Sequence, residues 1–175
     1  VHIDQETDYP ATGDVRLTVS TDAPHRFPLL IRVPQWADGA HIMLPDGMVT
    51  PVATGAYARI ERVWQGRETV TLSLPMAPRL HHATNRNVQE SFAPDGSPVA
   101  QEVLREDYVA FARGPLVYAT GLVDGYRTAE TLHRPVDETQ LMETIPADRG
   151  AAPDILVLRQ GAAPLRFEPF YAVGG

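Results

Sequence analysis

Proline and glycine interrupt this 175-residue chain so often that long helices are disfavoured. Sixteen prolines and thirteen glycines are spread along the sequence. Both residues end or kink helices and mark turns. Between them lie short runs in which apolar and polar side chains alternate, which is the pattern of half-buried strands. The chain is therefore expected to be an all-β protein.

About ten short strands can be read from this alternation, with little helix beside them. They suggest an antiparallel β-sandwich, jelly-roll-like in character, built as a single domain over residues 1–175. One short helix is expected within Thr128–Pro146. The main strand-like runs are Val15–Val19, Phe27–Val33, Ala40–Leu44, Val49–Val52, Tyr57–Trp64, Val70–Leu74, Tyr108–Arg113, Leu116–Ala119, Ile155–Leu158 and Leu165–Val173.

Turn residues predict how these strands are connected. Gln65–Glu68 is expected to close a hairpin with a four-residue loop, and Pro45–Gly47 is a strong turn signal. The polar segment His81–Val99 is expected to be a long loop. Gly114-Pro115 indicates a sharp corner, at which the chain either passes from one sheet to another or makes an ordinary turn.

Composition excludes several classes of protein. Hydrophobic residues make up 43% of the chain, which excludes a disordered protein. No apolar run approaches the roughly 20 residues of a membrane helix, so no membrane partner is expected. The net charge of −7 argues against a nucleic-acid partner. The sequence has no cysteine, and therefore no thiolate nucleophile or thiolate metal site. Nothing in it assigns a compartment.

Residues that could carry chemistry are few. Asp4, Glu6 and Asp8 share one strand face and could offer oxygen ligands to Ca²⁺, although a solvated strand face explains them as well. His81 and His82 are adjacent, and adjacent strand side chains diverge, so an exposed pair is favoured over a metal site. No spacing selects a pair of carboxylates for glycoside hydrolysis. No catalytic residue, metal ligand or cofactor is assigned.

Three aromatic residues are candidates for stacking on sugar rings, although such residues more often pack into a core or between domains. Trp64 ends a strand and is expected in the core. Trp36 lies in a turn and is the better candidate for an exposed or interdomain aromatic, so it is the expected residue for a carbohydrate or interdomain contact. Arg113 is predicted to be partly buried with a carboxylate or carbonyl partner, because an unpaired buried charge is too costly.

Several stretches together resemble glycoside hydrolase family 127, the β-L-arabinofuranosidases formerly called domain of unknown function 1680. Each motif is weak alone, but they occur in the family's order over most of the chain. Pro169–Tyr171 also resembles the related family 146. The matching segments are Glu6–Pro10, Gly13–Val15, Leu30–Ala37, Tyr57–Trp64, Val70–Met76, Arg79-Leu80, Arg113–Tyr118 and Pro169–Tyr171.

Some positions depart from the family pattern. Ala11 stands where tryptophan is common, and Gln35 stands where glycine is common. Ala119 and Gly121 replace a cysteine and a glutamate. The segment His81–Val99 is longer than usual for the family. These departures concern subfamily and substrate more than fold.

The resemblance implies that this chain is part of a longer glycosidase whose catalytic (α/α)6 barrel lies upstream. In the family that barrel holds a cysteine nucleophile near zinc, neither of which this chain can supply. The expected role is a non-catalytic C-terminal β-sandwich that packs against the barrel and stabilises it, with a homodimer as a further expectation. The alternative is an autonomous carbohydrate-binding module, with Trp36 as its contact.

Overall fold

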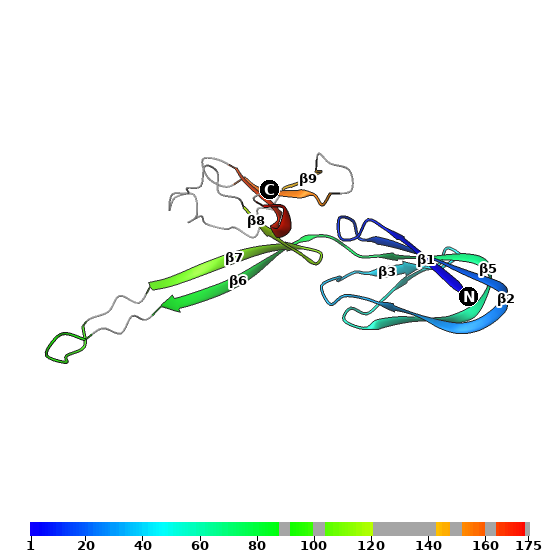
Figure 1. Cartoon of the computed structure of the whole chain (residues 1–175), viewed down its shortest axis with the longest axis horizontal. Coiled ribbons are helices and arrows are strands. Elements are labelled where there is room, and N and C mark those ends of the chain that lie inside the picture. Colours follow the sequence, from blue (N-terminus) through cyan, green and yellow to red (C-terminus); the bar gives the residue numbers. More distant parts are fainter. Residues whose placement is uncertain (88–91, 100–103, 121–142, 148–151, 160–163, 174–175) are drawn as a thin grey trace.

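The computed structural model describes residues 1–87, 92–99, 104–120, 143–147, 152–159 and 164–173. These residues form two antiparallel sheets, which lie end to end in an elongated molecule (Figure 1). The only helical element among them is the short 3-10 helix η2, Phe170–Ala172. The predicted all-β sandwich class is confirmed. None of the described helical residues forms a helix long and apolar enough to cross a membrane.

The first sheet has the strand order β1-β2-β5-β3-β4. Its two central strands, β2 and β5, are much longer than the other three and pair with each other along almost their whole length. The strands are β1 (His2–Thr7), β2 (Asp14–Arg32), β3 (His41–Met43), β4 (Val49–Pro51) and β5 (Tyr57–Ser73).

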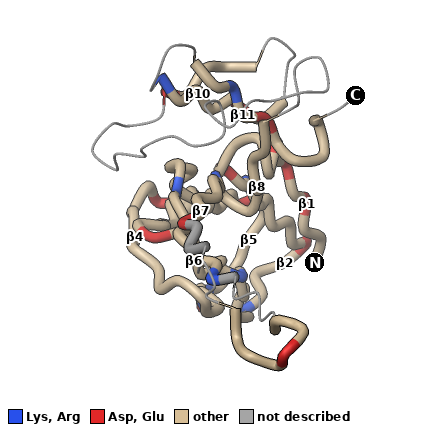
Figure 2. Tube along the Cα trace, turned by 90° about the vertical axis from the view of Figure 1, so that its left-hand side faces the viewer, with Lys and Arg blue, Asp and Glu red and all other residues tan. Residues whose placement is uncertain are grey.

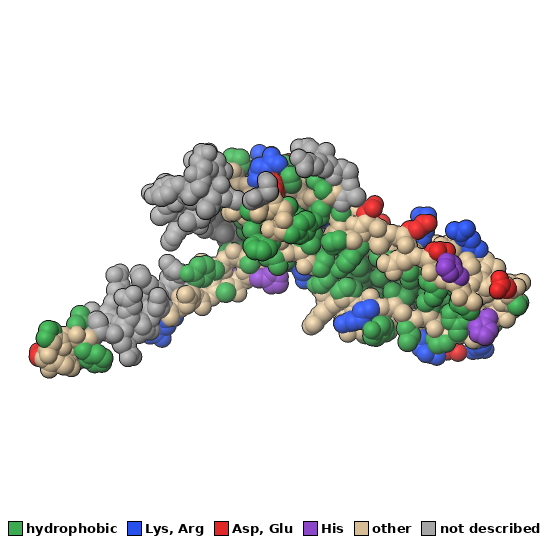
Figure 3. All heavy atoms as spheres, in the orientation of Figure 1, with side chains coloured by type: hydrophobic (Ala, Val, Ile, Leu, Met, Phe, Trp, Pro, Cys, Tyr) green, Lys and Arg blue, Asp and Glu red, His purple; other side chains and the backbone are tan. Residues whose placement is uncertain are grey.

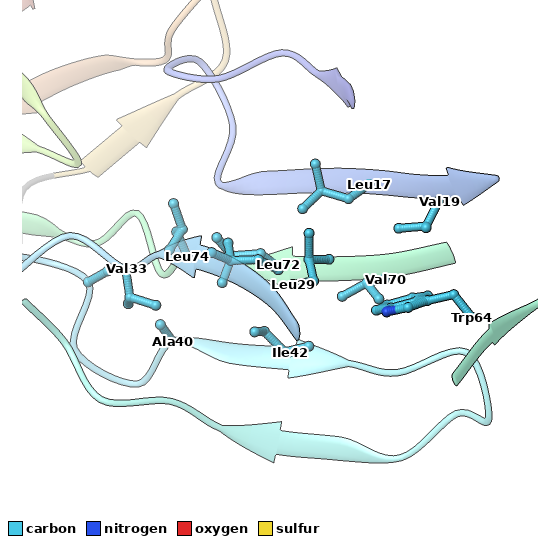
Figure 4. Close-up of a cluster of buried hydrophobic side chains, with 12 residues drawn as sticks. Leu17, Val19, Leu29, Val33, Ala40, Ile42, Trp64, Val70, Leu72 and Leu74 are labelled. Atoms are coloured by element: carbon cyan, nitrogen blue, oxygen red, sulfur yellow. The ribbon is translucent and has the colours of Figure 1, made fainter. Parts of the chain in front are cut away.

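The β2–β5 ribbon folds over on itself. In a straight strand Leu17 and Leu29 would lie about 40 Å apart, yet both belong to one buried cluster with Val70 (Figure 4). A bulge makes the bend, because Asp22–Pro24 of β2 lies opposite a single residue of β5. Bulges bend and twist a strand, so two halves of one ribbon enclose the first core.

β5 is continuous where a hairpin was predicted between Tyr57–Trp64 and Val70–Leu74, so that prediction is wrong. Gly66 does adopt a turn-like positive φ of 66°, but the chain bends there without reversing because β2 stays paired on both sides. Glu68 supports this bend. Its carboxylate accepts hydrogen bonds from Gln65 N at 3.0 Å and from Arg62 at 2.8 Å.

The turn and edge strands after β2 agree with the sequence pattern. β3 and β4 form a hairpin on the open side of β5. Gly47 takes a positive φ of 84° in the connecting turn, which glycine adopts without steric cost. The side chain of Asp46 accepts a hydrogen bond from Met48 N at 3.0 Å, as is typical of turn-forming aspartates.

The second sheet has the order β6-β7-β8-β11-β10-β9 and its own buried cluster, centred on Phe111, Tyr118 and Leu156. The late strands predicted at Ile155–Leu158 and Leu165–Val173 are present, the second ending earlier in η2. The strands are β6 (Pro78–Asn87), β7 (Leu104–Arg113), β8 (Leu116–Ala119), β9 (Glu143–Ile145), β10 (Ile155–Leu158) and β11 (Leu165–Pro169).

Two buried clusters thus occupy the two sheets, and the short segment between Ser73 and Pro78 connects them. That all 175 residues form one domain stays a prediction. Most of Thr128–Pro146, where a short helix was predicted, lies outside the described residues. Glu143–Ile145 within it is strand β9.

Gly114-Pro115 is the two-residue turn of a hairpin within one sheet, since Arg113 pairs with Leu116. A change of sheet at this corner, one of the two alternatives, is therefore wrong. Gly114 has a φ of 56°, and the ring of Pro115 fixes a negative φ. This combination fits a type II′ turn, whose twist matches that of paired strands.

The described residues of His81–Val99 are also more regular than the predicted long loop. Residues 81–87 belong to β6 and pair with β7, and Phe92 forms a bridge with Pro98 farther along the same hairpin. β6 and β7 project side by side from the rest of the molecule (Figure 1). The pattern was missed because every described side chain from His81 to Arg86 is exposed, so no apolar alternation marks the strand.

Replacing Trp64 with alanine tests the first core. Trp64 is fully buried and its indole N–H donates to Phe27 O at 3.0 Å. We expect Trp64→Ala to lower the free energy of unfolding by about 3–5 kcal/mol, as large-to-small core changes do. Urea unfolding measures this. Tyr57→Ala is the control, because Tyr57 is 65% exposed, and an unchanged midpoint for Trp64→Ala would contradict the buried position.

Candidate functional site at the junction of the two sheets

Arg113 is the side chain that connects the two sheets. It ends β7 and has only 12% of its side chain exposed. Its Nη1 donates to Ala11 O at 3.1 Å, in the loop between β1 and β2. Its Nη2 lies 2.8 Å from the carboxylate of Asp154, just before β10. The predicted partly buried arginine with a carboxylate or carbonyl partner is confirmed, and it has both.

Tyr118 extends this network within the second sheet. Its side chain is buried in the second core, and its hydroxyl donates to Asp154 O at 2.8 Å. Burial raises the pKa of the Tyr118 phenol, and the nearby Arg113 guanidinium opposes that rise only in part. Asp154 is thus held twice, through its carboxylate and through its backbone carbonyl.

Trp36 and Arg79 form a second contact across the junction. Trp36 comes from the turn after β2 and packs against the first core, while Arg79 belongs to β6. The Arg79 guanidinium lies 5.7 Å from the centre of the Trp36 ring, within the range of a cation–π interaction. The same guanidinium donates to Gly114 O at 2.7 Å. Trp36 is thus half-buried between the sheets.

Gly114 suits this junction because of its positive φ, and because a side chain there would displace the flexible end of Met76. A Cβ atom there would come within 2.4 Å of Met76 Cε and 3.5 Å of the Trp36 ring. Met76 lies in the connection from β5 to β6. Met76, which lies far from Arg113 and Gly114 in the sequence, therefore meets these two neighbouring motif residues at one place.

The other aromatic and acidic candidates lie elsewhere. Trp64 is in the first core, as predicted, and Tyr57 is exposed on the outer face of the first sheet. β1, which carries Asp4 and Glu6, is an edge strand with every side chain exposed, and Figure 2 shows acidic positions along it. Within the described part of the chain, no three histidine or acidic side chains are placed to hold a metal ion.

A shallow pocket opens at the junction. Two of its acidic side chains have partners within the protein: Asp14 accepts from the Ser73 hydroxyl at 2.8 Å, and Asp154 pairs with Arg113. This arrangement can fix one sheet against the other. The described lining residues are Asp8, Ala11, Thr12, Gly13, Asp14, Leu74, Met76, Arg113, Ala152 and Asp154.

Sequence reasoning found Arg113 and Trp36 but missed Asp154 and Ala11 as partners. Both lie in loops with no periodic pattern. The partner of Arg113 is set by how two sheets meet, over a sequence separation of 102 residues in the case of Ala11. No local signal could have identified it.

A two-sheet all-β unit joined by a buried arginine is the class that this fold and junction define. Residues 1–76 match the family model described as the middle domain of the glycoside hydrolase family 127 β-L-arabinofuranosidases. This match covers the first sheet and ends just before β6. It confirms the resemblance to family 127 and makes the first sheet homologous to that middle domain. The expected C-terminal position and the link to family 146 stay predictions.

Solved structures share the fold over nearly the whole chain. One, named a glycoside hydrolase, has 23% identity and a TM-score of 0.58 over 98% of this chain. Another, a GH127 β-L-arabinofuranosidase from Geobacillus stearothermophilus T6, has 25% identity and a TM-score of 0.58 over 97% of it. A third, a GH127 β-arabinofuranosidase, has 18% identity and a TM-score of 0.56 over 97%. No curated protein matches the chain in sequence.

The chain spans less than a third of the length of these structures. It covers 30%, 28% and 29% of them in the order given above. The activity named for those proteins is therefore a statement about them and not about this chain.

Replacing Arg113 tests the junction. Arg113→Leu leaves the Asp154 carboxylate without its cation and Ala11 O without its donor. Hydrogen bonds to charged groups contribute about 1.5–3 kcal/mol, so we expect a loss of that order in the free energy of unfolding, measured by urea denaturation. Arg26→Leu is the matched control, because Arg26 is 72% exposed and exposed ion pairs contribute little. Equal effects of the two changes would contradict the role of Arg113.

The raised pKa of Tyr118 predicts a loss of stability at alkaline pH. The folded state holds the proton more tightly than the unfolded state, so this contribution is complete below the ordinary tyrosine pKa of 10.0 and is lost as pH rises through the folded value. We expect Tyr118→Phe to reduce the fall in unfolding free energy above that pH. Tyr57→Phe is the control, because Tyr57 is 65% exposed. An unchanged alkaline fall in Tyr118→Phe would contradict this assignment.

Proposed function

We propose that this chain is a non-catalytic β-sandwich of a family-127-like glycosidase, where it packs against the catalytic (α/α)6 barrel and stabilises it. The observation that carries the proposal is the match of residues 1–76 to a middle domain. A middle domain has neighbours in its own polypeptide. The barrel, its zinc and its arabinofuranosidase activity belong to the proposed parent enzyme and not to this chain.

Two features of the chain support a non-catalytic role. It has no cysteine, whereas the family resemblance implies a cysteine nucleophile held near zinc. Its junction residues are engaged with each other, as the contacts of Arg113 with Ala11 and Asp154 illustrate. On this proposal the chain's own role is structural support of the barrel. A homodimer contact is a further part of the proposal.

The alternative is an autonomous carbohydrate-binding module. Trp36 would then be the residue that binds the sugar, since an indole that keeps part of its ring surface exposed can stack on a sugar ring. The cation–π contact with Arg79 and the packing beside Gly114 already occupy part of that ring. We therefore favour an interdomain role for Trp36 over sugar binding.

Activity and binding measurements on two proteins test the proposal. The natural full-length protein should release sugar from an aryl β-L-arabinofuranoside, and its upstream sequence should hold a helical barrel with a cysteine cluster. The 175-residue chain alone should release none. In calorimetric titration with arabino-oligosaccharides, we expect this chain to show no binding tighter than about 1 mM, or about −4 kcal/mol.

Trp36→Ala is the matched variant for the titration, with Tyr57→Ala as its control. Clear binding by the chain that is lost only in Trp36→Ala would replace the proposal with the carbohydrate-binding module. Sugar release by the chain alone would make it an independent hydrolase.

A further inference from the structure

The outer face of the bent ribbon carries an unusual set of side chains. On the half of the first sheet where Arg32 pairs with Tyr57, alternate residues of β2 and β5 point away from the core. We call these eight side chains the arginine strip. They are Arg26, Pro28, Leu30 and Arg32 of β2 and Tyr57, Arg59, Glu61 and Val63 of β5.

The arginine strip is apolar and positively charged at once. Three of its members, Leu30, Tyr57 and Val63, are 53%, 65% and 51% exposed. Figure 3 shows hydrophobic and arginine side chains lying beside one another on the first sheet. Aromatic residues and arginine are enriched in protein interfaces, and they dominate the residues that carry binding energy.

The charge of the arginine strip differs in sign from that of the whole chain. Three arginines stand against the single acid Glu61, in a chain whose net charge is −7. Arg59 and Arg26 lie 2.8 and 3.5 Å from the Glu61 carboxylate, and Arg59, with Arg26 adding to it, lowers the pKa of that carboxyl. Arg32 lies over the Tyr57 ring. The positive charge in excess of Glu61 has no acidic partner among these strip residues.

An apolar recess adjoins the arginine strip. Arg59 and Glu61 of the strip belong to its lining, and its apolar lining residues include Leu44, Met48, Val52 and Ile60. Interfaces gain most of their binding energy where an apolar side chain fills a desolvated pocket. A surface that combines this recess with an excess of guanidinium charge fits a partner that is acidic and carries an apolar anchor.

We propose that the arginine strip and its recess are the docking surface for an acidic face of the upstream catalytic domain. This inference rests on the proposed function and specifies which surface of the chain makes the contact. Charge complementarity supports it, because arginine forms bidentate pairs with carboxylates. The relatives' length supports it too, since more than two thirds of each solved relative lies outside the part matched here. A second copy docking through the same face would place arginine against arginine.

Arginine-specific labelling with phenylglyoxal, read by mass spectrometry, tests the docking surface. The chain contains no lysine, which simplifies the comparison between the 175-residue chain and the natural full-length protein. We expect Arg26 and Arg59 to react at least about fivefold more slowly in the full-length protein, because interface centres are desolvated. Arg67 is the internal control, being exposed on β5 outside the strip, and its reactivity should not change.

A charge reversal gives an independent measurement. In the full-length protein, Arg59→Glu should speed the limited proteolysis that separates the barrel from this chain, and Arg67→Glu should not. Thermal unfolding of the 175-residue chain carrying each change reports any loss of its own stability, so that a folding defect is recognised.

Each result bears on the proposal. Protection of Arg26 and Arg59 confined to the full-length protein would support it. Equal reactivity in a protein that does contain the barrel would overturn the docking surface and leave the proposed function standing. Protection that appears in the 175-residue chain as its concentration rises would assign the surface to self-association and overturn the inference. A natural full-length protein without the barrel would contradict both the docking surface and the proposed function.

Discussion

Bending of the β2–β5 ribbon is the constraint on which the first sheet depends. A two-stranded ribbon exposes both faces to water and is marginally stable by itself. Folding over at the Asp22–Pro24 bulge lets the inner faces of the two halves bury each other. Trp64 lies opposite His25, at the bulge, and its buried indole fills the inside of the bend while donating to Phe27 O. β1, β3 and β4 pair along this ribbon, and Ile42 of β3 completes the core that it encloses.

Arg113 supplies the corresponding constraint between the sheets. The connection from β5 to β6 is short and cannot fix an orientation alone, so side chains must do so. A guanidinium suits this position because its planar fork donates in two directions at once, here to Ala11 O and to Asp154. Arg79 of the second sheet makes a further contact across the junction, with the ring of Trp36 from the first sheet, beside the contacts of Arg113. The motif residues that resemble family 127 are therefore mostly fold and junction residues, which fits the supporting role proposed above.

The surface of the first sheet divides by charge. The edge strand β1 carries acidic side chains, and charges on an edge discourage pairing with other chains. The outer face of the bent ribbon instead presents arginine with large apolar side chains. The first sheet thus combines a charged edge strand with an exposed face of arginine and large apolar side chains, which is the face proposed above as a docking surface.

By itself, the sequence determined the all-β class, the Pro45–Gly47 turn and the β3–β4 hairpin, because local alternation and turn chemistry act through nearby residues. It also determined that Trp64 is buried and that Arg113 needs a partner, since burying an unpaired charge is costly. Only the tertiary structure decided that β5 bends at Gly66 without reversing, that Gly114-Pro115 stays within one sheet, and that Asp154 meets Arg113. Those outcomes depend on which strands pair across long sequence separations. The same turn signal fits a bend or a reversal until the partner strand is known.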